Sequence, residues 1–497
     1  MTKVLIANRG EIALRIIRAC HEEGLEAVAV YSDADRLAAH VRAADHAVRL
    51  GPAAPAESYL RIDRIVEAAR ASGATLVHPG YGFLAERAAF ADAVVTAGLT
   101  FVGPPADAIR AMGDKTSARE RMAAAGVPIV PGAHVEAGRP DVAAAAAAAV
   151  GFPLVVKASA GGGGRGMRIV RTAAELPGAL ASAASEAEKA FGDGRVYLER
   201  YIERGRHVEV QVLADAERVV HLGERECSIQ RRYQKLVEES PSVAVTPELR
   251  RALGAAAVSA ARAVGYRSAG TIEFLLASDG SFYFLEMNTR IQVEHPVTEL
   301  VYGVDLVREQ LRVAQGLPMR IPDRELFPRG WAIECRITSE DPAAGFLPGN
   351  GSIEYLRVPG GPGIRWDGGY ELGDGVTLFY DSLIGKLIAW GGGRDEAIAR
   401  MRRALDEFIL SGVPTSIPFH RRLLADAAFA RGEIDTQFLE RRQDLVRSEP
   451  DPATVEAIAV AAALAEDAAR ELHRPVVADD ARARPAWLAA ARRESLR

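Results

Sequence analysis

Short apolar runs alternate with amphipathic stretches through the first part of the chain. The strand-like runs are residues 3–8, 27–31, 75–78 and 100–103. Between the first two runs, residues 12–23 carry apolar side chains at helical spacing. This order of strand, helix and strand predicts an open parallel α/β sheet over residues 1–112, with its ligand edge at the carboxyl ends of the strands.

Strand candidates become denser between residues 113 and 329. They are residues 152–158, 167–170, 196–201, 207–213, 271–277 and 281–287. This pattern predicts an α+β body. The glycine content of residues 131–202 suggests that this part closes over the site as a lid, because loops that exclude water protect a labile intermediate.

The remainder of the chain divides into a mixed region and a tail. Residues 330–445 contain two strand candidates, 331–337 and 384–390, and an amphipathic helix at 394–410, which predict a mixed α+β third domain. Beyond residue 446 the composition shifts to Ala, Arg and Asp, with a helix predicted at 452–473. We expect this helical tail, residues 446–497, to pack on the third domain; docking against another subunit is the alternative.

Charge and cysteine content exclude several classes of protein. The 497 residues carry a formal net charge of -5, so the chain lacks the basic footprint of a general nucleic-acid or membrane-surface binder. Cys20, Cys227 and Cys335 are far apart, which argues against a disulfide framework and a paired-cysteine metal site. The first apolar run is too brief for a signal peptide or a membrane span, and we expect a cytoplasmic protein.

Lysine is rare in this chain. The 61 basic residues include only Lys3, Lys115, Lys157, Lys189, Lys235 and Lys386. Where a sequence favours arginine so strongly, a lysine can mark a place that needs a compact point charge, such as a phosphate contact. Chance surface lysines are the alternative.

A glycine-rich loop lies between two predicted strands. Residues 161–166 read Gly-Gly-Gly-Gly-Arg-Gly and match GxGxxG, the pattern of a dinucleotide-binding turn. That turn opens a helix, however, whereas residues 167–170 are strand-like. We therefore expect either a hairpin loop that folds over nucleotide phosphates, with Lys157 on the preceding strand, or a simple flexible turn.

Two glutamates are predicted to face each other across a hairpin. The strands on either side of a two-residue Asp279–Gly280 turn pair outward from that turn, which places Leu275 opposite Phe284. The same arithmetic places Glu273 opposite Glu286. Opposed like charges in apolar surroundings need a compensating cation or a shared proton.

A divalent metal would satisfy that need. Mg²⁺ is commonly held by carboxylates together with substrate phosphates, and Asn288 on the same face can add an oxygen ligand. Two solvated surface glutamates are the alternative.

The residues after this hairpin are dense in polar groups. Arg290 can bind a small planar oxyanion with two parallel hydrogen bonds, Gln292 and the backbone N–H of Val293 can orient it, and Glu294 can remove its proton. The sequence therefore predicts an enzyme that uses ATP and a divalent metal to activate a small oxyanion.

Several motifs in order support one family resemblance. They are Ile6-Ala-Asn-Arg-Gly-Glu-Ile-Ala13, His78-Pro-Gly-Tyr-Gly-Phe83, the glycine loop, Cys227-Ser-Ile-Gln-Arg-Arg-Tyr-Gln-Lys235, Glu286-Met-Asn-Thr-Arg-Ile-Gln-Val-Glu-His295 and Glu334-Cys-Arg336. By these motifs, residues 1–445 resemble the biotin carboxylase family of the ATP-grasp superfamily. The resemblance implies a biotin carboxylase N-terminal domain at 1–112, an ATP-grasp domain with its lid at 113–329, and a biotin carboxylase C-terminal domain at 330–445.

The resemblance also implies an activity and the residues that support it. ATP would phosphorylate bicarbonate to carboxyphosphate, whose CO₂ passes to N1 of biotin. The residues that would hold ATP are Lys115, Lys157, Gly161, Gly162, Gly163, Gly164, Gly166, Met167, Glu199, Ile202, His207, Gln230 and Leu275. Those that would hold Mg²⁺ or Mn²⁺ are Glu273, Glu286 and Asn288. Bicarbonate would be bound by Lys235, Arg290, Gln292 and Val293, with Glu294 as the base, while Arg336 would stabilise the biotin enolate.

The partners follow from the same resemblance. No lysine lies in a biotinylation motif, so biotin is expected on a separate biotin carboxyl carrier protein, and a carboxyltransferase subunit would select acetyl-CoA, another acyl-CoA or pyruvate as the final acceptor. A homodimer is implied, with Arg15 as an interface residue. Tyr233 stands where many relatives carry His, which leaves any nucleotide contact of that imidazole in doubt.

Two other functions remain open from the sequence. Another ATP-grasp ligase, for instance of the carbamoyl-phosphate type, would share the nucleotide and metal groups, but Arg336 and the cluster from Arg290 to Glu294 disfavour it. A silent nucleotide-binding scaffold is disfavoured by the intact polar cluster.

Overall fold

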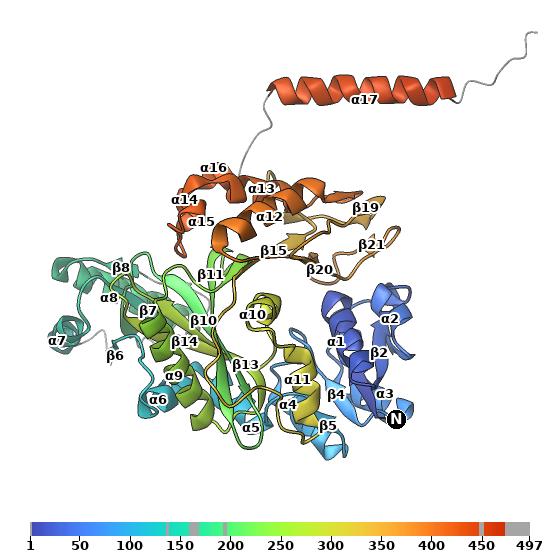
Figure 1. The fold of residues 1–497 in the computed structure, drawn as a ribbon. Coiled ribbons are helices and arrows are strands. Elements are labelled where there is room, and N and C mark those ends of the chain that lie inside the picture. The colour runs from blue at the N-terminus through green and yellow to red at the C-terminus, as the bar shows by residue number, and fades with distance from the viewer. Residues whose placement is uncertain (1, 136–138, 159–167, 192–195, 447–451, 473–497) are drawn as a thin grey trace, which may run out of the picture. The chain divides into compact units, whose positions relative to one another are not determined.

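A computed structural model describes residues 2–135, 139–158, 168–191, 196–446 and 452–472 (Figure 1). The chain forms two compact units, residues 1–447 and 448–497. The glycine loop at 161–166 and the neighbouring Met167 lie outside the described residues.

The N-terminal part is an open parallel sheet. Its strands, in spatial order, are β3 (His46–Gly51), β2 (Glu26–Ser32), β1 (Lys3–Ile6), β4 (Leu76–His78) and β5 (Thr100–Phe101). The helices are α1 (Gly10–Glu22), α2 (Ala39–Ala43), α3 (Ile62–Ser72), α4 (Ala88–Thr96) and α5 (Ala106–Gly113). Ile12 and Ile16 of α1 lie at helical spacing and pack with Val4 and Ile6 of β1 in one buried cluster. The predicted parallel α/β fold is confirmed, although the largely exposed edge strand β3 was not predicted.

An eight-stranded antiparallel sheet forms the centre of the first unit (Figure 1). In spatial order its strands are β14 (Phe282–Asn288), β13 (Ser268–Leu276), β10 (Arg206–Ala214), β11 (Val219–Arg231), β12 (Gln234–Ser240), β15 (Trp331–Thr338), β22 (Leu383–Gly391) and β20 (Ile364–Gly368). The sheet continues without interruption from the predicted ATP-grasp region into the predicted third domain, because β12 pairs with β15.

The two faces of this sheet differ in chemistry. On β10, Val208 and Val210 point to a face that packs with apolar residues of α9 (Pro247–Ala263). His207 and Glu209 alternate with them and point to the opposite face. That face meets α10 (His295–Tyr302), because Thr298 of α10 accepts a hydrogen bond from the sheet. The remaining helices of this region are α6 (Lys115–Ala124) and α11 (Leu306–Ala314).

A smaller antiparallel sheet lies within the predicted lid. Its order is β6 (Gly132–Val135), β9 (Val196–Arg200), β7 (Leu154–Ala158) and β8 (Arg168–Val170), with helices α7 (Pro140–Val150) and α8 (Leu176–Phe191) packed on it. β7 and β8 are antiparallel neighbours, with Leu154 opposite Val170. The prediction of two strands around the glycine loop is therefore confirmed.

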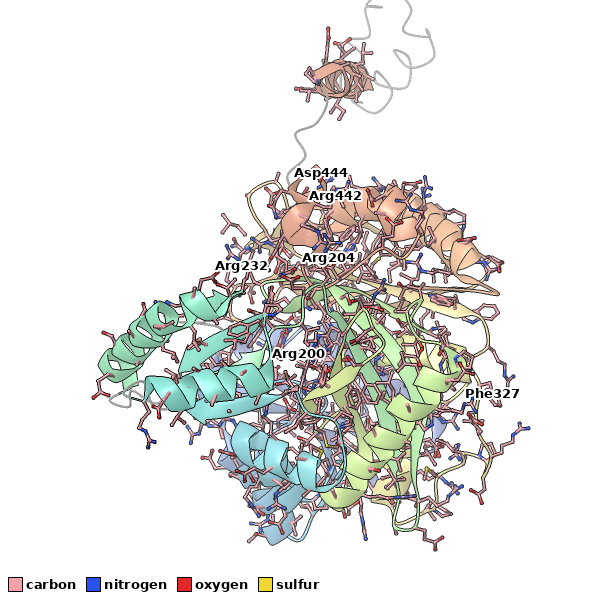
Figure 2. The ribbon with its side chains drawn as sticks, turned by 90° about the vertical axis from the view of Figure 1, so that its left-hand side faces the viewer. Arg200, Arg204, Arg232, Phe327, Arg442 and Asp444 are labelled. Atoms are coloured by element: carbon pink, nitrogen blue, oxygen red, sulfur yellow. The ribbon has the colours of Figure 1, made fainter. Side chains whose placement is uncertain are left out.

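Short elements complete the C-terminal part of the first unit. The strands are β16 (Glu340–Asp341), β17 (Leu347–Pro348), β18 (Gly351–Ser352), β19 (Tyr355–Arg357), β21 (Gly375–Val376) and β23 (Ile409–Ser411). The helices are α12 (Arg394–Glu407), α13 (Ile417–Ala425), α14 (Ala427–Ala430), α15 (Phe438–Arg441) and α16 (Gln443–Val446). The helix predicted at 394–410 was too long, because residues 409–411 pair with β19 instead. Arg442 donates hydrogen bonds to Asp426 and Asp444 and so connects residues at the ends of these short helices. Figure 2 labels Arg442 and Asp444.

The second unit contains one described helix, α17 (Pro452–Leu472). Its large apolar side chains Val455, Ile458, Val460 and Leu464 are exposed. No helix within the described ranges combines the length and the apolar character needed to cross a membrane.

Candidate active site

A row of charged side chains crosses four neighbouring strands of the eight-stranded sheet. Glu286 on β14 lies opposite Glu273 on β13, which lies opposite Glu209 on β10. Glu209 in turn lies opposite Arg225 on β11. The predicted opposition of the first two glutamates is confirmed. Glu286 is exposed and the other three residues are buried, so the row runs from the surface into the core.

The hairpin that carries two of these glutamates turns differently from the prediction. The turn consists of residues 278–280, and Gly280 occupies the left-handed region with φ 85°. Leu275 consequently lies opposite Tyr283, and not opposite Phe284 as predicted. A register shift of one residue follows before the two glutamates. The prediction was thus wrong about the turn and right about the acidic pair, because the two shifts cancel.

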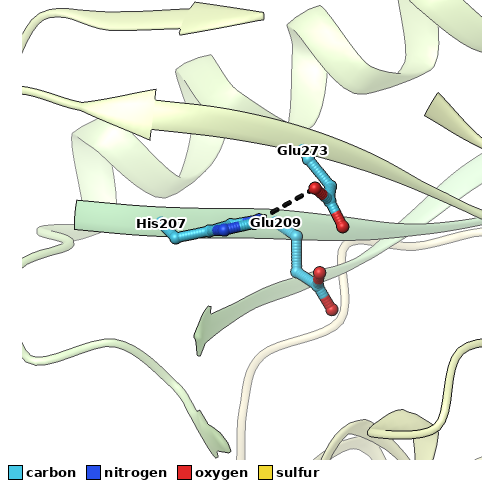
Figure 3. A group of neighbouring side chains, drawn as sticks. All are labelled: His207, Glu209 and Glu273. Carbon is cyan, nitrogen blue, oxygen red and sulfur yellow. Dashed lines mark ion pairs between the residues drawn. The ribbon is translucent and has the colours of Figure 1, made fainter. Parts of the chain in front are cut away.

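Lys235 supplies much of the positive charge in this acidic site. Its Nζ donates to Glu209 at 2.6 Å, to Glu273 at 2.9 Å and to Glu294 at 2.7 Å. His207 forms a further ion pair with Glu273 at 3.0 Å (Figure 3). Cations of the protein itself therefore compensate the charge of Glu273, one of the two opposed glutamates.

These cations determine the proton affinity of the buried carboxylates. Burial alone would raise the pKa of Glu273, but Lys235 and His207 outweigh burial and hold that pKa well below its usual range. Burial would likewise raise the pKa of Glu294, yet Lys235 and Arg336 hold it well below the ordinary value. Both carboxylates are therefore ionised at neutral pH.

Arg336 on β15 connects the proposed base to a third carboxylate. Its Nη2 donates to Glu294 Oε2 at 2.9 Å, and its Nε donates to Glu238 Oε1 at 2.6 Å. Burial raises the pKa of Glu238 to about 7, although Arg336 opposes this shift. The structure thus brings together Lys235, Glu294 and Arg336, which the resemblance had placed in one site.

The loop between β14 and α10 presents further polar groups. Arg290 donates to Asn288 Oδ1 at 3.1 Å and to Gln292 Oε1 at 2.9 Å, and it forms an ion pair with Glu86 at 3.1 Å. Asn288 Nδ2 donates to Glu273 at 2.8 Å. Gln292 Nε2 is buried and has no hydrogen-bond partner among the described residues, so it is available as a donor to a small oxyanion.

The predicted nucleotide residues are brought together only in part. Ile202 and Leu275 border the same glycine, because a methyl group on Gly205 would lie 2.7 Å from Leu275 Cδ1 and 3.3 Å from Ile202 Cγ2. Lys157 forms an ion pair with Glu199 at 2.9 Å.

The other predicted nucleotide residues, and a second partner of Glu199, lie as follows. Arg119 also binds Glu199, at 2.8 Å. Gln230 lies opposite Lys235 in the β11–β12 register. Lys115 begins α6, but its side chain lies outside the described part of the chain, as do Gly161, Gly162, Gly163, Gly164, Gly166 and Met167.

The turn between β11 and β12 carries the unusual Tyr233. Arg232 and Tyr233 both have positive φ, 49° and 68°, which is a conformation that bulky side chains seldom adopt. Tyr233 is 76% exposed, and Arg232 reaches the surface beside it (Figure 2). The tyrosine hydroxyl is therefore accessible to solvent at the edge of the site.

The residues predicted to hold a metal fit a hard divalent cation. Glu273, Glu286 and Asn288 offer carboxylate and amide oxygens, the donors that Mg²⁺ and Mn²⁺ prefer. Side-chain spacing marks a different candidate set, His207, Glu209 and Glu273, whose ligand atoms lie within 4.8 Å of one another. We favour the first set because it offers oxygen donors alone, whereas the second set includes the ring nitrogen of His207, a donor that suits softer metals better than Mg²⁺.

Comparison with known proteins identifies the family. The model of the biotin carboxylase N-terminal domain matches residues 1–109, and that of the biotin carboxylase C-terminal domain matches residues 334–441. Between them, residues 114–321 match the ATP binding domain of the carbamoyl-phosphate synthase L chain. Biotin carboxylase 1 of Bacillus subtilis is 53% identical over 440 residues, which cover 88% of this chain and 98% of the relative.

The chain belongs to the biotin carboxylase family. The biotin carboxylase of Haemophilus influenzae is 51% identical over 445 residues, which cover 89% of this chain and 99% of that protein. A solved biotin carboxylase domain dimer of Hydrogenobacter thermophilus 2-oxoglutarate carboxylase, in complex with MgADP, ADP and bicarbonate, has a TM-score of 0.80 and 48% identity, covering 90% of this chain and 98% of that one. As a member of the biotin carboxylase family, the chain is an ATP-dependent ligase that carboxylates biotin.

Sequence analysis missed several charged residues of this biotin carboxylase site. Glu209 and Glu238 contact the predicted Lys235 and Arg336, and Arg225 contacts Glu209. None of these three residues was predicted. One signal was available, because His207 and Glu209 alternate with valines on β10, and a polar set at every second position of an apolar strand indicates a functional face. No comparable signal marks Arg225, whose role follows from strand pairing between distant segments.

Proposed function

We propose that this chain catalyses the first half-reaction of a biotin-dependent acyl-CoA or pyruvate carboxylase. ATP phosphorylates bicarbonate to carboxyphosphate, whose CO₂ passes to N1 of biotin on a separate carrier protein. The observation that most supports this chemistry is the buried Glu294 held between Lys235 and Arg336, with the unsatisfied Nε2 of Gln292 two residues away. Such a site offers one base and several donors to a small oxyanion.

Bicarbonate would be bound by Lys235, Arg290, Gln292 and the N–H of Val293, and Glu294 would accept its proton. The low pKa of Glu294 without substrate makes it a weak base, because Lys235 and Arg336 stabilise its charge. When those cations turn part of their hydrogen bonding to substrate oxygens, the proton affinity of Glu294 rises. Proton transfer is thereby coupled to the arrival of bicarbonate.

ATP would occupy the region of Lys115, Lys157, His207, Gln230 and the glycine loop, with Glu199, Ile202 and Leu275 around the adenine. Lys157 would exchange Glu199 for a phosphate oxygen, since a more highly charged group can replace the carboxylate in this ion pair. A bound Mg²⁺ or Mn²⁺ would neutralise phosphate charge, and Glu273, Glu286 and Asn288 would hold it.

Arg336 would stabilise the enolate oxygen of biotin through its guanidinium group. Its Nε is engaged by Glu238, which fixes the plane of the guanidinium while Nη2 spans to Glu294. The base and the biotin oxyanion site thus share one cation.

Domain boundaries, partners and location complete the proposal. We assign residues 1–112, 113–329 and 330–445 to three domains, with a lid at 131–202 and an Ala/Arg-rich helical tail at 446–497. The chain would act in the cytoplasm as a homodimer with a carboxyltransferase subunit and a biotin carboxyl carrier protein. Arg15 is proposed at the dimer interface, although within one chain it pairs with Glu299 at 2.9 Å and Asp305 at 2.6 Å.

One assay separates this function from its rivals. Phosphate release from ATP should require bicarbonate and should increase when free biotin is added, with carboxybiotin as the product. Cleavage that ignores biotin but responds to ammonia or an amino acid would support a ligase with another acceptor. ATP binding without any bicarbonate-dependent cleavage would support a scaffold.

A further inference from the structure

Lys386 is a buried lysine that the proposed chemistry leaves unexplained. It lies on β22, its side chain is 0% exposed, and in this arginine-rich chain only six lysines occur. Its Nζ donates to the backbone carbonyl of Val293 at 2.9 Å and forms an ion pair with Glu11 at 3.2 Å. A buried charge is costly unless it is paired, so these two contacts account for the position of the ammonium group.

His295 makes a similar contact one peptide earlier. It is fully buried at the start of α10, and its Nδ1 lies 2.7 Å from the carbonyl oxygen of Gln292. A carbonyl can only accept, so Nδ1 carries the proton. Burial, assisted by the nearby Lys386, holds the pKa of His295 well below its usual value, and the ring is neutral.

The two contacts act on consecutive peptide units of the bicarbonate loop, residues 290–294. Because a peptide unit is planar, the orientation of the Gln292 carbonyl also sets the direction of the Val293 N–H. In the same way, the orientation of the Val293 carbonyl sets the plane of the peptide unit between Val293 and Glu294. His295 and Lys386 thus fix both the backbone donor and the starting point of the proposed base.

We propose that Lys386 and His295 are positioning residues that hold the bicarbonate loop in its binding geometry by fixing two consecutive peptide planes. This inference rests on the proposed function, because it assigns the loop to bicarbonate. Neither side chain is required to touch the substrate.

The lysine also ties the loop to the N-terminal part of the chain. Glu11, its ion-pair partner, lies in the first turn of α1 and accepts a hydrogen bond from the hydroxyl of Tyr81. The chain of contacts therefore runs from Tyr81 through Glu11 and Lys386 to Val293. A single ammonium group can bond a carboxylate and a carbonyl in different directions, whereas the planar fork of arginine favours two oxygens in one plane.

Matched variants of His295 provide the first test. His295→Asn places an amide N–H near the position of Nδ1 and retains a donor for the Gln292 carbonyl, whereas His295→Gln places its amide farther out, near Nε2. Steady-state bicarbonate-dependent ATP cleavage is measured in CO₂-depleted buffer. We expect His295→Gln to raise KM for bicarbonate about tenfold with KM for ATP within about twofold, and His295→Asn to recover most of that loss.

The role of Lys386 is tested in a background in which its charge partner Glu11 is already replaced by glutamine. Lys386→Met alone would leave Glu11 buried without a cation, so Glu11→Gln/Lys386→Met is compared with Glu11→Gln. The double variant should again raise KM for bicarbonate about tenfold over the single variant, with KM for ATP within about twofold. If the double variant does not fold, as judged by thermal melting, the His295 pair decides the question.

The outcomes separate this inference from the function on which it rests. A parent protein without bicarbonate-dependent cleavage would refute the proposed function. An active parent whose His295→Gln and double variants keep its KM for bicarbonate would refute the positioning role alone. Equal losses for both substrates, or no difference between His295→Asn and His295→Gln, would show a merely structural role and would also overturn the inference.

Discussion

Replacing Glu294 with glutamine tests the proposed base directly. In the structure each oxygen of this buried carboxylate accepts from a different cation, Lys235 at 2.7 Å and Arg336 at 2.9 Å. Glutamine keeps one oxygen, which can accept from one of the two cations. Its NH₂ group would face the other cation, and no hydrogen bond can form there because both groups are donors. One charge-assisted hydrogen bond is therefore lost. We expect the free energy of unfolding to fall by about 3–5 kcal/mol, the usual cost of breaking a buried ion pair, and bicarbonate-dependent turnover to fall by about 10²–10⁴ because the proton acceptor is gone.

The assay must separate chemistry from nucleotide binding. Phosphate release and carboxybiotin formation report turnover, while ATP affinity is measured by calorimetry. That affinity should stay within about threefold of the parent, since the hydrogen bonds of Glu294 to described residues go to Lys235 and Arg336, neither of which is proposed to bind ATP. Glu238→Gln is the matched control. It also removes a buried carboxylate from Arg336, but not the proposed base.

Two results would refute this reasoning. Turnover of Glu294→Gln within tenfold of the parent would exclude Glu294 as the base. Equal losses in Glu294→Gln and Glu238→Gln would show that the effect comes from an unbalanced Arg336 and not from the missing proton acceptor.

Two further predictions concern stability and nucleotide binding. The folded-state pKa of Glu238, about 7, lies above the ordinary value of 4.5, so the folded protein holds a proton that the unfolded chain releases between these values. The contribution of Glu238 to the free energy of unfolding should therefore fall by about 3 kcal/mol as pH rises from about 4.5 to 7, and urea unfolding of Glu238→Gln should lose this part of the slope. Gly205→Ala should raise KM for ATP about tenfold and leave KM for bicarbonate unchanged, because the added methyl displaces Leu275; an unchanged KM for ATP would place the adenine elsewhere.

The parts of the site that could be predicted are those with a local signal. The opposition of Glu273 and Glu286 follows from a single hairpin, in which both strands and the turn lie within a short stretch of sequence. Even there the turn was wrong, and a compensating irregularity kept the pair in register. A single one-residue shift would have moved every side chain of one strand to the other face of the sheet. The pair was predicted correctly because a second shift reversed the first.

The parts that could not be predicted depend on pairing between distant segments. Arg225 meets Glu209 because β10 and β11 pair with an irregularity between them, and Lys386 lies opposite Arg336 because β15 pairs with β22. No local pattern states which strands become neighbours. The edge strand β3 was missed for a related reason, since its mostly exposed residues lack the apolar run of a buried strand.

The pairing of β12 with β15 means that the boundary proposed at residues 329 and 330 is a division of roles and not of folding. A fragment that ended before Trp331 would expose the edge of β12, and the complementary fragment would expose β15. Unpaired edges of this kind promote aggregation. The two halves should therefore become soluble only when they are produced together, so that β12 and β15 can pair again. A chimera with the C-terminal half of another carboxylase should fold only if the first strand of that half forms the same hydrogen bonds with β12.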